Sequence, residues 1–160
     1  MISIRIIALG KIKESYLQDG VAEYVKRLGA MCKLRIVELP DEKSPPDAAP
    51  AEIGRIKEVE GQRLVQALAT DEYCIALDSA GTQLSSYKFA EKLARLPLDG
   101  HSRLAFCIGA SYGISESALR RADFCLSFGS MTFPHQLMRL ILLEQIYRAF
   151  KINRGEPYHK

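Results

Sequence analysis

The residues with the most evident chemistry stand near the end of the sequence. Tyr158 and His159 lie between Arg154 and Lys160. A phenol, an imidazole and two cations can hold an anionic substrate, move a proton or stabilise a charge that develops on a reacting group. Terminal segments are also commonly frayed. The residue types therefore leave two interpretations open, a disordered end and an arm that contacts a substrate.

Three glycine-containing loops form a second candidate site. They follow three predicted strands and comprise residues 78–82, 109–113 and 129–134. Glycine lets the backbone approach a ligand closely, and backbone N–H and C=O groups can then read a planar base. Each loop taken alone is more typical of an ordinary turn. Three such loops in succession favour a ligand site.

Several common catalytic patterns are missing from the sequence. There is no phosphate-binding GxxxxGKS or GxxxxGKT loop, and residues 10–13 (GKIK) do not form a GxGxxG dinucleotide fingerprint. No GxSxG elbow or HExxH pair occurs, and His101, His135 and His159 are too scattered to suggest a metal site. The sequence thus disfavours a P-loop nucleotidase, a usual Rossmann cofactor site and a metal centre. It favours a structural role for His135.

Alternating strands and helices are expected to position these residues. Such alternation is typical of a parallel sheet with helices on both faces, in which ligands bind beyond the carboxyl ends of the strands. Ser86 and Ser115 are expected to cap two of the helices. Strands are predicted at residues 2–9, 34–39, 73–77, 104–108 and 124–128, and helices at residues 14–28, 51–68, 86–96, 116–121 and 134–153.

The chain is expected to form a single domain over residues 1–160. Residues 40–50 contain four prolines among acidic and polar side chains, a composition that predicts a mobile loop. The segments on either side are too small to bury separate cores, so the loop is interpreted as an excursion within one domain. Residues 155–160 form a basic tail.

Composition and charge narrow the function further. Of the 160 residues, 48% are hydrophobic and 26% are charged, which excludes a disordered or fibrous chain. The formal net charge is only +3, but residues 101–160 carry 8 basic and 4 acidic side chains. An anionic partner is therefore expected to meet that part of the chain, although a solvated basic helix face explains the charge equally well.

Cysteine usage and hydropathy predict a cytoplasmic protein. The four cysteines, at positions 32, 74, 107 and 125, form no CxxC pair and lie mostly in apolar runs, which is typical of reduced, buried thiols. No apolar run approaches the roughly 20 residues of a membrane helix.

The predicted helix at 134–153 has more apolar residues than a single core contact needs, which favours a homodimer. Arg139 and Arg148 are expected to lie away from the buried side of this helix.

At these residues the sequence resembles the RlmH family, SPOUT-class methyltransferases that modify a pseudouridine of large-subunit ribosomal RNA. The resemblance covers nearly the whole chain, and the proline-rich loop matches in position and character. The motifs that carry it are residues 10–14 (GKIKE), 23–24 (EY), 77–78 (LD), 130–135 (SMTFPH), 144–149 (EQIYRA) and 157–160 (PYHK).

This resemblance implies an α/β fold of SPOUT type, in which the C-terminal segment threads a loop to form a trefoil knot. It also implies a homodimer that binds S-adenosylmethionine without a metal ion. The implied reaction transfers the methyl group to N3 of the pseudouridine at position 1915 of 23S ribosomal RNA. The small net charge favours the assembled ribosome over free RNA as the substrate.

The resemblance further implies roles for individual residues. His159, Tyr158 and Arg154 are the implied catalytic residues, and Lys160 aligns with a terminal basic residue of the family. Ala110 stands where the family usually has a second glycine, and its methyl group could restrict the approach of the backbone to the cofactor. The implied cofactor-binding residues are Leu77, Gly109, Phe128, Gly129, Ser130, Met131, Thr132 and Phe133.

One alternative from another class stays open. A nonenzymatic ribosome-binding or nucleotide-binding α/β module would explain the basic C-terminal region as well as an enzyme does. It would not explain the motifs at 130–135 and 157–160.

Overall fold

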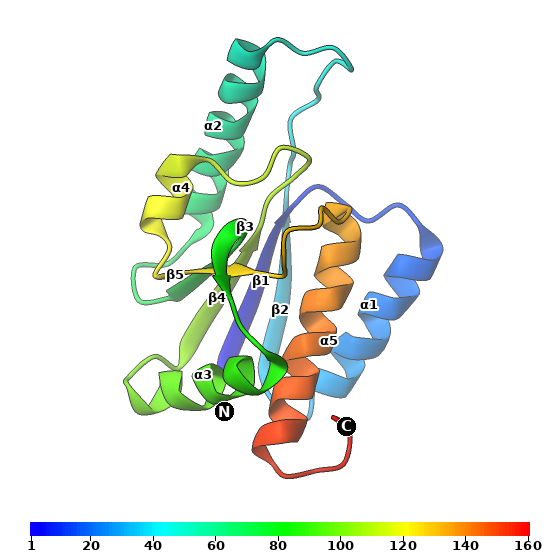
Figure 1. Ribbon diagram of the computed structural model, residues 1–160, viewed down its shortest axis with the longest axis vertical. Coiled ribbons are helices and arrows are strands. Elements are labelled where there is room, and N and C mark those ends of the chain that lie inside the picture. Colours follow the sequence, from blue (N-terminus) through cyan, green and yellow to red (C-terminus); the bar gives the residue numbers. More distant parts are fainter.

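Five strands form one parallel sheet, as the alternation of strand and helix patterns predicts. The computed structural model describes residues 1–160. The strand order is β2-β1-β4-β3-β5, and every pairing is parallel (Figure 1). The strands are β1 (Ser3–Leu9), β2 (Lys33–Leu39), β3 (Tyr73–Gln83), β4 (Arg103–Ile108) and β5 (Phe124–Ser127), and the helices are α1 (Ser15–Leu28), α2 (Pro50–Ala67), α3 (Ser86–Leu98), α4 (Glu116–Arg121) and α5 (His135–Asn153).

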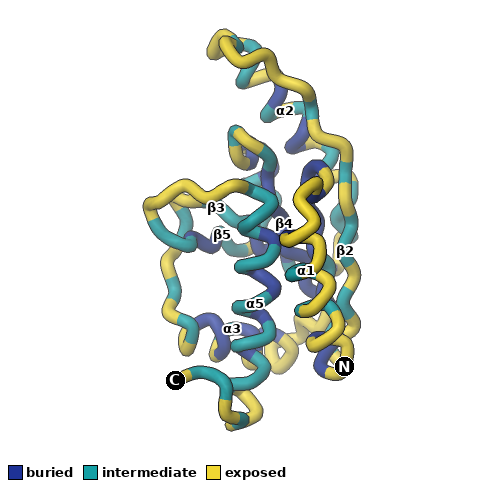
Figure 2. The backbone as a smooth tube through the Cα atoms, turned by 90° about the vertical axis from the view of Figure 1, so that its right-hand side faces the viewer, coloured by how far each residue is buried: buried dark blue, intermediate teal, exposed yellow.

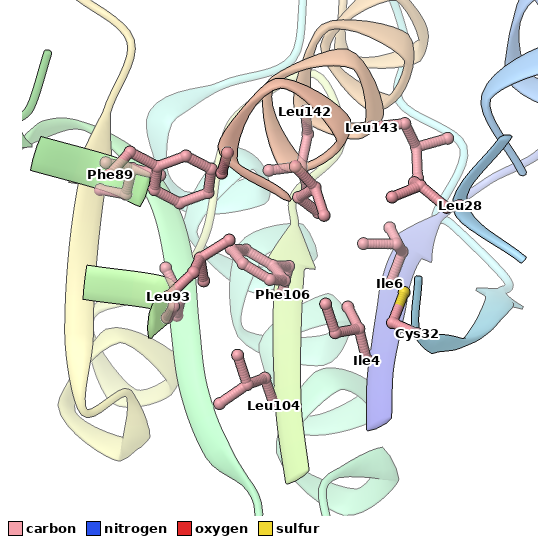
Figure 3. Close-up of a cluster of buried hydrophobic side chains, with 14 of the residues drawn as sticks. Ile4, Ile6, Leu28, Cys32, Phe89, Leu93, Leu104, Phe106, Leu142 and Leu143 are labelled. Carbon is pink, nitrogen blue, oxygen red and sulfur yellow. The ribbon is translucent and has the colours of Figure 1, made fainter. Parts of the chain in front are cut away.

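Helices cover both faces of the sheet. Successive side chains of a strand point to opposite faces, so Ile6 packs in the larger core beneath α1, α3 and α5, whereas Ile7 packs in the smaller core beneath α2 and α4. Figure 3 shows the larger core, in which Phe106 of the central strand β4 meets Phe89 of α3 and Leu142 of α5. Each fully buried side chain of this size stabilises the fold by about 1.5–3 kcal/mol. The predicted α/β class is confirmed.

Strand β3 is longer than the sequence pattern predicts. The expected strand ends at Leu77, but pairing with β5 resumes at Thr82. Leu126 of β5 faces both Leu77 and Thr82, so residues 78–81 bulge out of the ladder. The predicted end of the strand at Leu77 is therefore wrong, because residues 78–81 form a bulge within β3 and not a loop that follows it.

Local capping explains where two helices begin. Ser115 caps α4 as expected, because its side chain accepts a hydrogen bond from the Ala118 N–H. The prediction for α3 is wrong by one residue. Ser85 accepts from the Lys88 N–H at 3.1 Å, whereas the Ser86 hydroxyl donates to Gln145 Oε1 of α5 at 2.8 Å.

Arg139 of α5 lies on the buried side of its helix, contrary to the prediction. It is only 3% exposed. Its guanidinium lies 2.5 Å from Glu38 Oε2 and donates to the Gly10 carbonyl at 3.1 Å, where β2 and β1 end. A buried charge is tolerated only when it is paired and hydrogen-bonded, and a helical pattern does not reveal a partner 101 residues away.

The apolar surplus of α5 is largely used within the chain. Helix α5 packs between α1 and α3 (Figure 1), and its buried apolar residues include Leu142, Leu143 and Ile146. Met138 and Ile141 are half-buried, and Met138 lines a cavity described below. The homodimer expected from this surplus stays a prediction, as does the trefoil knot.

The proline-rich loop projects beyond the sheet together with the start of α2 and is mostly exposed (Figure 2). Pro50 occupies the first turn of α2, where its missing N–H has no consequence. Glu42 anchors the loop, since its N–H donates to Glu60 Oε2 at 2.9 Å and its carboxylate pairs with Arg63 at 2.9 Å. The mobility expected of this loop stays a prediction.

Two further sequence expectations concern the cysteines and membranes. Cys32, Cys74 and Cys107 are buried and Cys125 is half-buried, and all four thiols are free. None of the helices is long and apolar enough to cross a membrane.

Candidate functional site

A cavity of about 290 Å³ opens at the bulge of β3 and where β4 and β5 end. These three strands are neighbours in the sheet, so the bulge and the loops after β4 and β5 meet at one edge. The lining comes from all three segments and from the first turn of α5. It comprises residues 77–79, 108–113, 126, 128–129, 131–133, 135 and 138. The predicted convergence of the three loops is therefore correct.

Most of the residues expected to bind a cofactor lie in this cavity. Ser130 is the exception, because it is exposed and does not contribute to the lining. The residues that do line the cavity are Leu77, Gly109, Phe128, Gly129, Met131, Thr132 and Phe133.

The loop after β4 is a tight turn that requires glycine at both ends. A Cβ on Gly109 would lie 2.7 Å from the carbonyl carbon of Gly113, and Gly113 has a φ of +82°. The Gly113 N–H donates to the Ala110 carbonyl at 3.0 Å and closes the turn. No residue other than glycine has a positive φ. The methyl group of Ala110 is thus accommodated without backbone strain.

The loop after β5 has unpaired backbone N–H groups at residues that line the cavity. Ser127 fixes its start, because its hydroxyl donates to the Ser79 carbonyl at 3.0 Å and accepts from the Gly129 N–H at 3.1 Å. The N–H groups of Met131 and Thr132 have no backbone acceptor within the chain. Free backbone donors beside apolar side chains suit a planar heterocycle that carries hydrogen-bond acceptors.

Sequence reasoning missed two α5 residues at this cavity. His135 was expected to be structural, yet it lines the cavity together with Met138, one turn further along α5. Burial lowers the pKa of His135; Asp41 acts against this effect and Arg139 adds to it. Helical spacing from the loop could have indicated both residues, since positions three apart lie on the same face.

A second cavity, of about 400 Å³, adjoins the first through Ala110, Ser111 and Tyr112. Its other side is formed by the proline-rich loop and α2. The Tyr112 hydroxyl is hydrogen-bonded to Ser44 of that loop. Glu60 lies at this cavity, and burial raises its pKa. The proline-rich loop is thereby connected to one of the loops that surround the first cavity.

Tyr158 is docked against α1 and α5. Its hydroxyl donates to Glu144 Oε1 at 3.1 Å and lies 3.1 Å from the Tyr24 hydroxyl. Its ring meets that of Tyr147 edge to face at 4.9 Å. Burial raises the pKa of Tyr158 well above its ordinary value, and the hydrogen bond with Tyr24 and the charge of Glu144 raise it further. Tyr158 is therefore a neutral phenol that donates a hydrogen bond.

His159 is held by two side chains. Its Nδ1 lies 2.9 Å from Arg148 Nη1, and its ring lies 4.7 Å from the ring of Tyr87, nearly perpendicular to it. Arg148 is also paired with Glu144 at 2.5 Å. Arg154, in contrast, is exposed at the end of α5 and its side chain forms no hydrogen bond within the chain. The structure thus brings Tyr158 and His159 together through the Glu144–Arg148 pair. Arg154 does not take part in this group of hydrogen-bonded side chains.

The two candidate sites lie at opposite ends of α5 (Figure 1). The cavity surrounds the start of this helix, and the tail follows its end. Tyr158 and His159 contact Glu144 and Arg148, which lie about 14 and 20 Å along the helix from His135 at the cavity. One copy of the chain therefore does not bring Tyr158 and His159 to its own cavity.

Comparisons with known proteins show which family this chain resembles. The family model described as "Predicted SPOUT methyltransferase" matches residues 2–159. A protein of Carboxydothermus hydrogenoformans called Ribosomal RNA large subunit methyltransferase H is 54% identical over 157 residues, which cover 98% of this chain and 99% of the relative. A protein of the same name from Bacillus thuringiensis is 53% identical over 158 residues, 99% of each chain.

Solved structures share the fold at much lower identity. The tRNA (m1G37) methyltransferase from Aquifex aeolicus superimposes with a TM-score of 0.52 over 91% of this chain and 69% of its own, at 13% sequence identity. At this identity the likeness concerns the fold alone.

Proposed function

The chain belongs to the RlmH family of SPOUT methyltransferases, and we propose that it transfers a methyl group from S-adenosylmethionine to N3 of a pseudouridine in 23S ribosomal RNA. The observation that carries this proposal is the cavity at the bulge of β3 and the carboxyl ends of β4 and β5. It combines tight glycine turns with free backbone donors. The relatives' name supports ribosomal RNA of the large subunit as the methyl acceptor.

The cavity residues fit S-adenosylmethionine. Leu77 and Phe128 provide apolar contacts for a flat adenine ring, and the free N–H groups of Met131 and Thr132 can donate to ring nitrogens. When bound, S-adenosylmethionine supplies a methyl group on a positively charged sulfur, which is already activated for transfer. No nucleophilic side chain is then required. The cavity residues bind the donor and align its methyl group with the attacking atom.

The tail residues are proposed to act on the methyl acceptor. N3 of the base loses its proton before or during attack, and negative charge then spreads onto the neighbouring carbonyl oxygens. Hydrogen-bond donors and cations aimed at these oxygens stabilise that charge. His159 is a donor of this kind, Tyr158 would reach the base only by giving up its hydrogen bond to Glu144, and Arg154 is an exposed cation at the end of α5. The raised pKa of Tyr158 argues against a phenolate acting as the base.

The separation along α5 supports a homodimer whose sites are shared. Because Tyr158 and His159 contact Glu144 and Arg148, they lie about 14–20 Å along α5 from His135 at the cavity of their own chain, and a second copy would supply the tail that acts there. Two copies related by a twofold axis would form two equivalent sites. The excess of basic residues in 101–160 supports ribosomal RNA as the partner, and the small net charge of +3 supports an assembled ribosome.

Calorimetry tests the proposed cofactor directly. We expect the protein to bind S-adenosylmethionine and its demethylated product, but not ATP-Mg, because the lysine-containing phosphate loop is absent. Micromolar binding of ATP-Mg without any response to S-adenosylmethionine would instead support the nonenzymatic nucleotide-binding module.

A further inference from the structure

We infer that Arg148 holds His159 as the neutral tautomer with its proton on Nε2, so that His159 donates a hydrogen bond to a carbonyl oxygen of the target base and does not act as its proton acceptor. This inference rests on the proposed function. It assigns a catalytic role to His159 and a positioning role to Arg148.

The contact between the two side chains determines the tautomer. A guanidinium group has only donors, so Arg148 Nη1, at 2.9 Å, must donate to His159 Nδ1. A neutral imidazole that accepts at Nδ1 carries its proton on Nε2. An imidazolium would place two N–H groups against each other at this contact. The contact thus assigns the acceptor role to Nδ1 and the donor role to Nε2.

Other contacts fix Arg148 and the ring plane. Glu144 Oε1 accepts hydrogen bonds from Arg148 Nε at 3.0 Å and from Nη2 at 2.5 Å, which leaves Nη1 to face His159. The Tyr87 ring of α3 lies 4.7 Å from the imidazole at an interplanar angle of 86°. The imidazole therefore has neighbours on α3 and α5, and its orientation is set before a substrate arrives.

The Nε2 atom is free to meet a substrate. It has no hydrogen-bond partner in the chain, and it is not among the buried unpartnered atoms, which are Glu60 Oε1 and Arg139 Nε. His159 therefore presents an N–H donor at the surface. A hydrogen bond from this N–H to the carbonyl oxygen beside N3 becomes stronger as negative charge develops on that oxygen. The proton of N3 then passes to water, and the electron pair of N3 forms the new bond to the methyl carbon while the bond from that carbon to sulfur breaks and its electron pair stays on the sulfur.

Side-chain nitrogen NMR tests the tautomer without any assay of activity. We expect His159 of the intact protein to show a protonated Nε2 and an unprotonated Nδ1. Arg148→Met removes the donor, and His159 should then sample both tautomers. Arg27→Met is the matched control, because Arg27 lies over the rings of Tyr24 and Tyr147 and forms no hydrogen bond with His159. A protonated Nδ1 in the intact protein would overturn the inference.

Two substitutions of His159 separate a donor from a base. Glutamine keeps an N–H donor near the position of Nε2 but does not accept a proton, whereas alanine does neither. We expect His159→Gln to keep methyl transfer within about tenfold of the intact protein and His159→Ala to lose about hundredfold or more. Equal loss in both variants would contradict the donor role. Absence of methyl transfer by the intact protein would refute the proposed function, and NMR would still decide the tautomer.

Discussion

The hydroxyl of Tyr24 on α1 lies 3.1 Å from the hydroxyl of Tyr158 in the tail, although 134 residues separate them in sequence. This contact joins the first helix to the segment that carries His159. The tail is therefore an ordered part of the surface formed by α1, α3 and α5. The interpretation of the tail as a disordered end does not agree with these contacts.

Removing the Tyr24 hydroxyl should loosen the tail. We expect Tyr24→Phe to lower the free energy of unfolding by about 1 kcal/mol and to slow methyl transfer several-fold. The reason is that the Tyr158 hydroxyl loses one of its two hydrogen-bond partners, Tyr24 and Glu144. Tyr16→Phe on the same helix is the control, since Tyr16 is 70% exposed. Urea unfolding and single-turnover transfer measure the two effects. Unchanged transfer in Tyr24→Phe would show that this contact does not position the tail.

The turn after β4 should tolerate no side chain at its first glycine. In Gly109→Ala the new Cβ would meet the backbone of Gly113 at 2.7 Å, so the turn must open and distort the cavity. We expect affinity for S-adenosylmethionine to fall by about tenfold or more, which corresponds to about 1.4 kcal/mol. Gly54→Ala in α2 is the matched control, because nothing lies within 4 Å of its added Cβ.

The opposite effect on affinity for S-adenosylmethionine is expected from a substitution of Ala110 in the same turn. Ala110→Gly should leave binding of S-adenosylmethionine equal or tighter, because it removes a methyl group from the cavity lining. Calorimetry measures all three alanine and glycine variants. Clearly weaker binding by Ala110→Gly would show that the methyl group contributes to the site.

Truncation after Pro157 should separate methyl transfer from cofactor binding. The cavity lies at the other end of α5, so affinity for S-adenosylmethionine should stay within about twofold, while transfer falls by about hundredfold or more. The sequence alone favours an unchanged melting temperature. The contacts of Tyr158 instead predict a loss of about 1–2 kcal/mol in the free energy of unfolding.

Mixing two impaired proteins, at a concentration of S-adenosylmethionine that the Gly109→Ala cavity does not bind, tests whether the tail acts on the partner's cavity. The truncated chain keeps its cavity, and full-length Gly109→Ala keeps its tail. When equal amounts are coexpressed, half of the dimers contain one copy of each, and each of these has one complete shared site. We expect about a quarter of the intact activity. No activity in the mixture would contradict a site shared between two copies.

Alkaline pH should weaken the fold through Cys32. Burial raises the pKa of this thiol from 9.0 to about 11. The folded chain thus holds a proton that the unfolded chain releases above pH 9, and the stability that depends on it is lost as pH rises from 9 to 11. The loss should reach about 2–3 kcal/mol. Urea unfolding of Cys32→Ala should show a flatter dependence over this range, and parallel curves for the two proteins would refute the assignment.

Periodicity predicted most of the scaffold because the strands and helices are amphipathic or buried in simple patterns. Helix α4 begins and ends as expected, and the convergence of the three loops follows from the order of adjacent strands. Loop glycines were informative for a physical reason. A Cβ at Gly109 would collide with the backbone, so the glycine in the sequence indicates a tight turn at this position.

Contacts between distant residues could not be predicted in this way. The burial of Arg139 depends on Glu38 and the Gly10 carbonyl, and no local pattern reveals partners so far apart. The bulge in β3 depends on Leu126 facing both Leu77 and Thr82. The docking of the tail likewise depends on side chains from α1, α3 and α5 that only the folded chain brings together.

Methylation of ribosomes is the most direct test of the proposed function. Ribosomes that lack the modification, and naked ribosomal RNA, are incubated with the protein and S-adenosylmethionine carrying a labelled methyl group. The RNA is then digested to nucleosides for mass spectrometry. We expect one methyl group per ribosome, located on N3 of a pseudouridine, with slower transfer to naked RNA. Labelled methyl on any other nucleoside, or no transfer to either substrate, would contradict the proposed function.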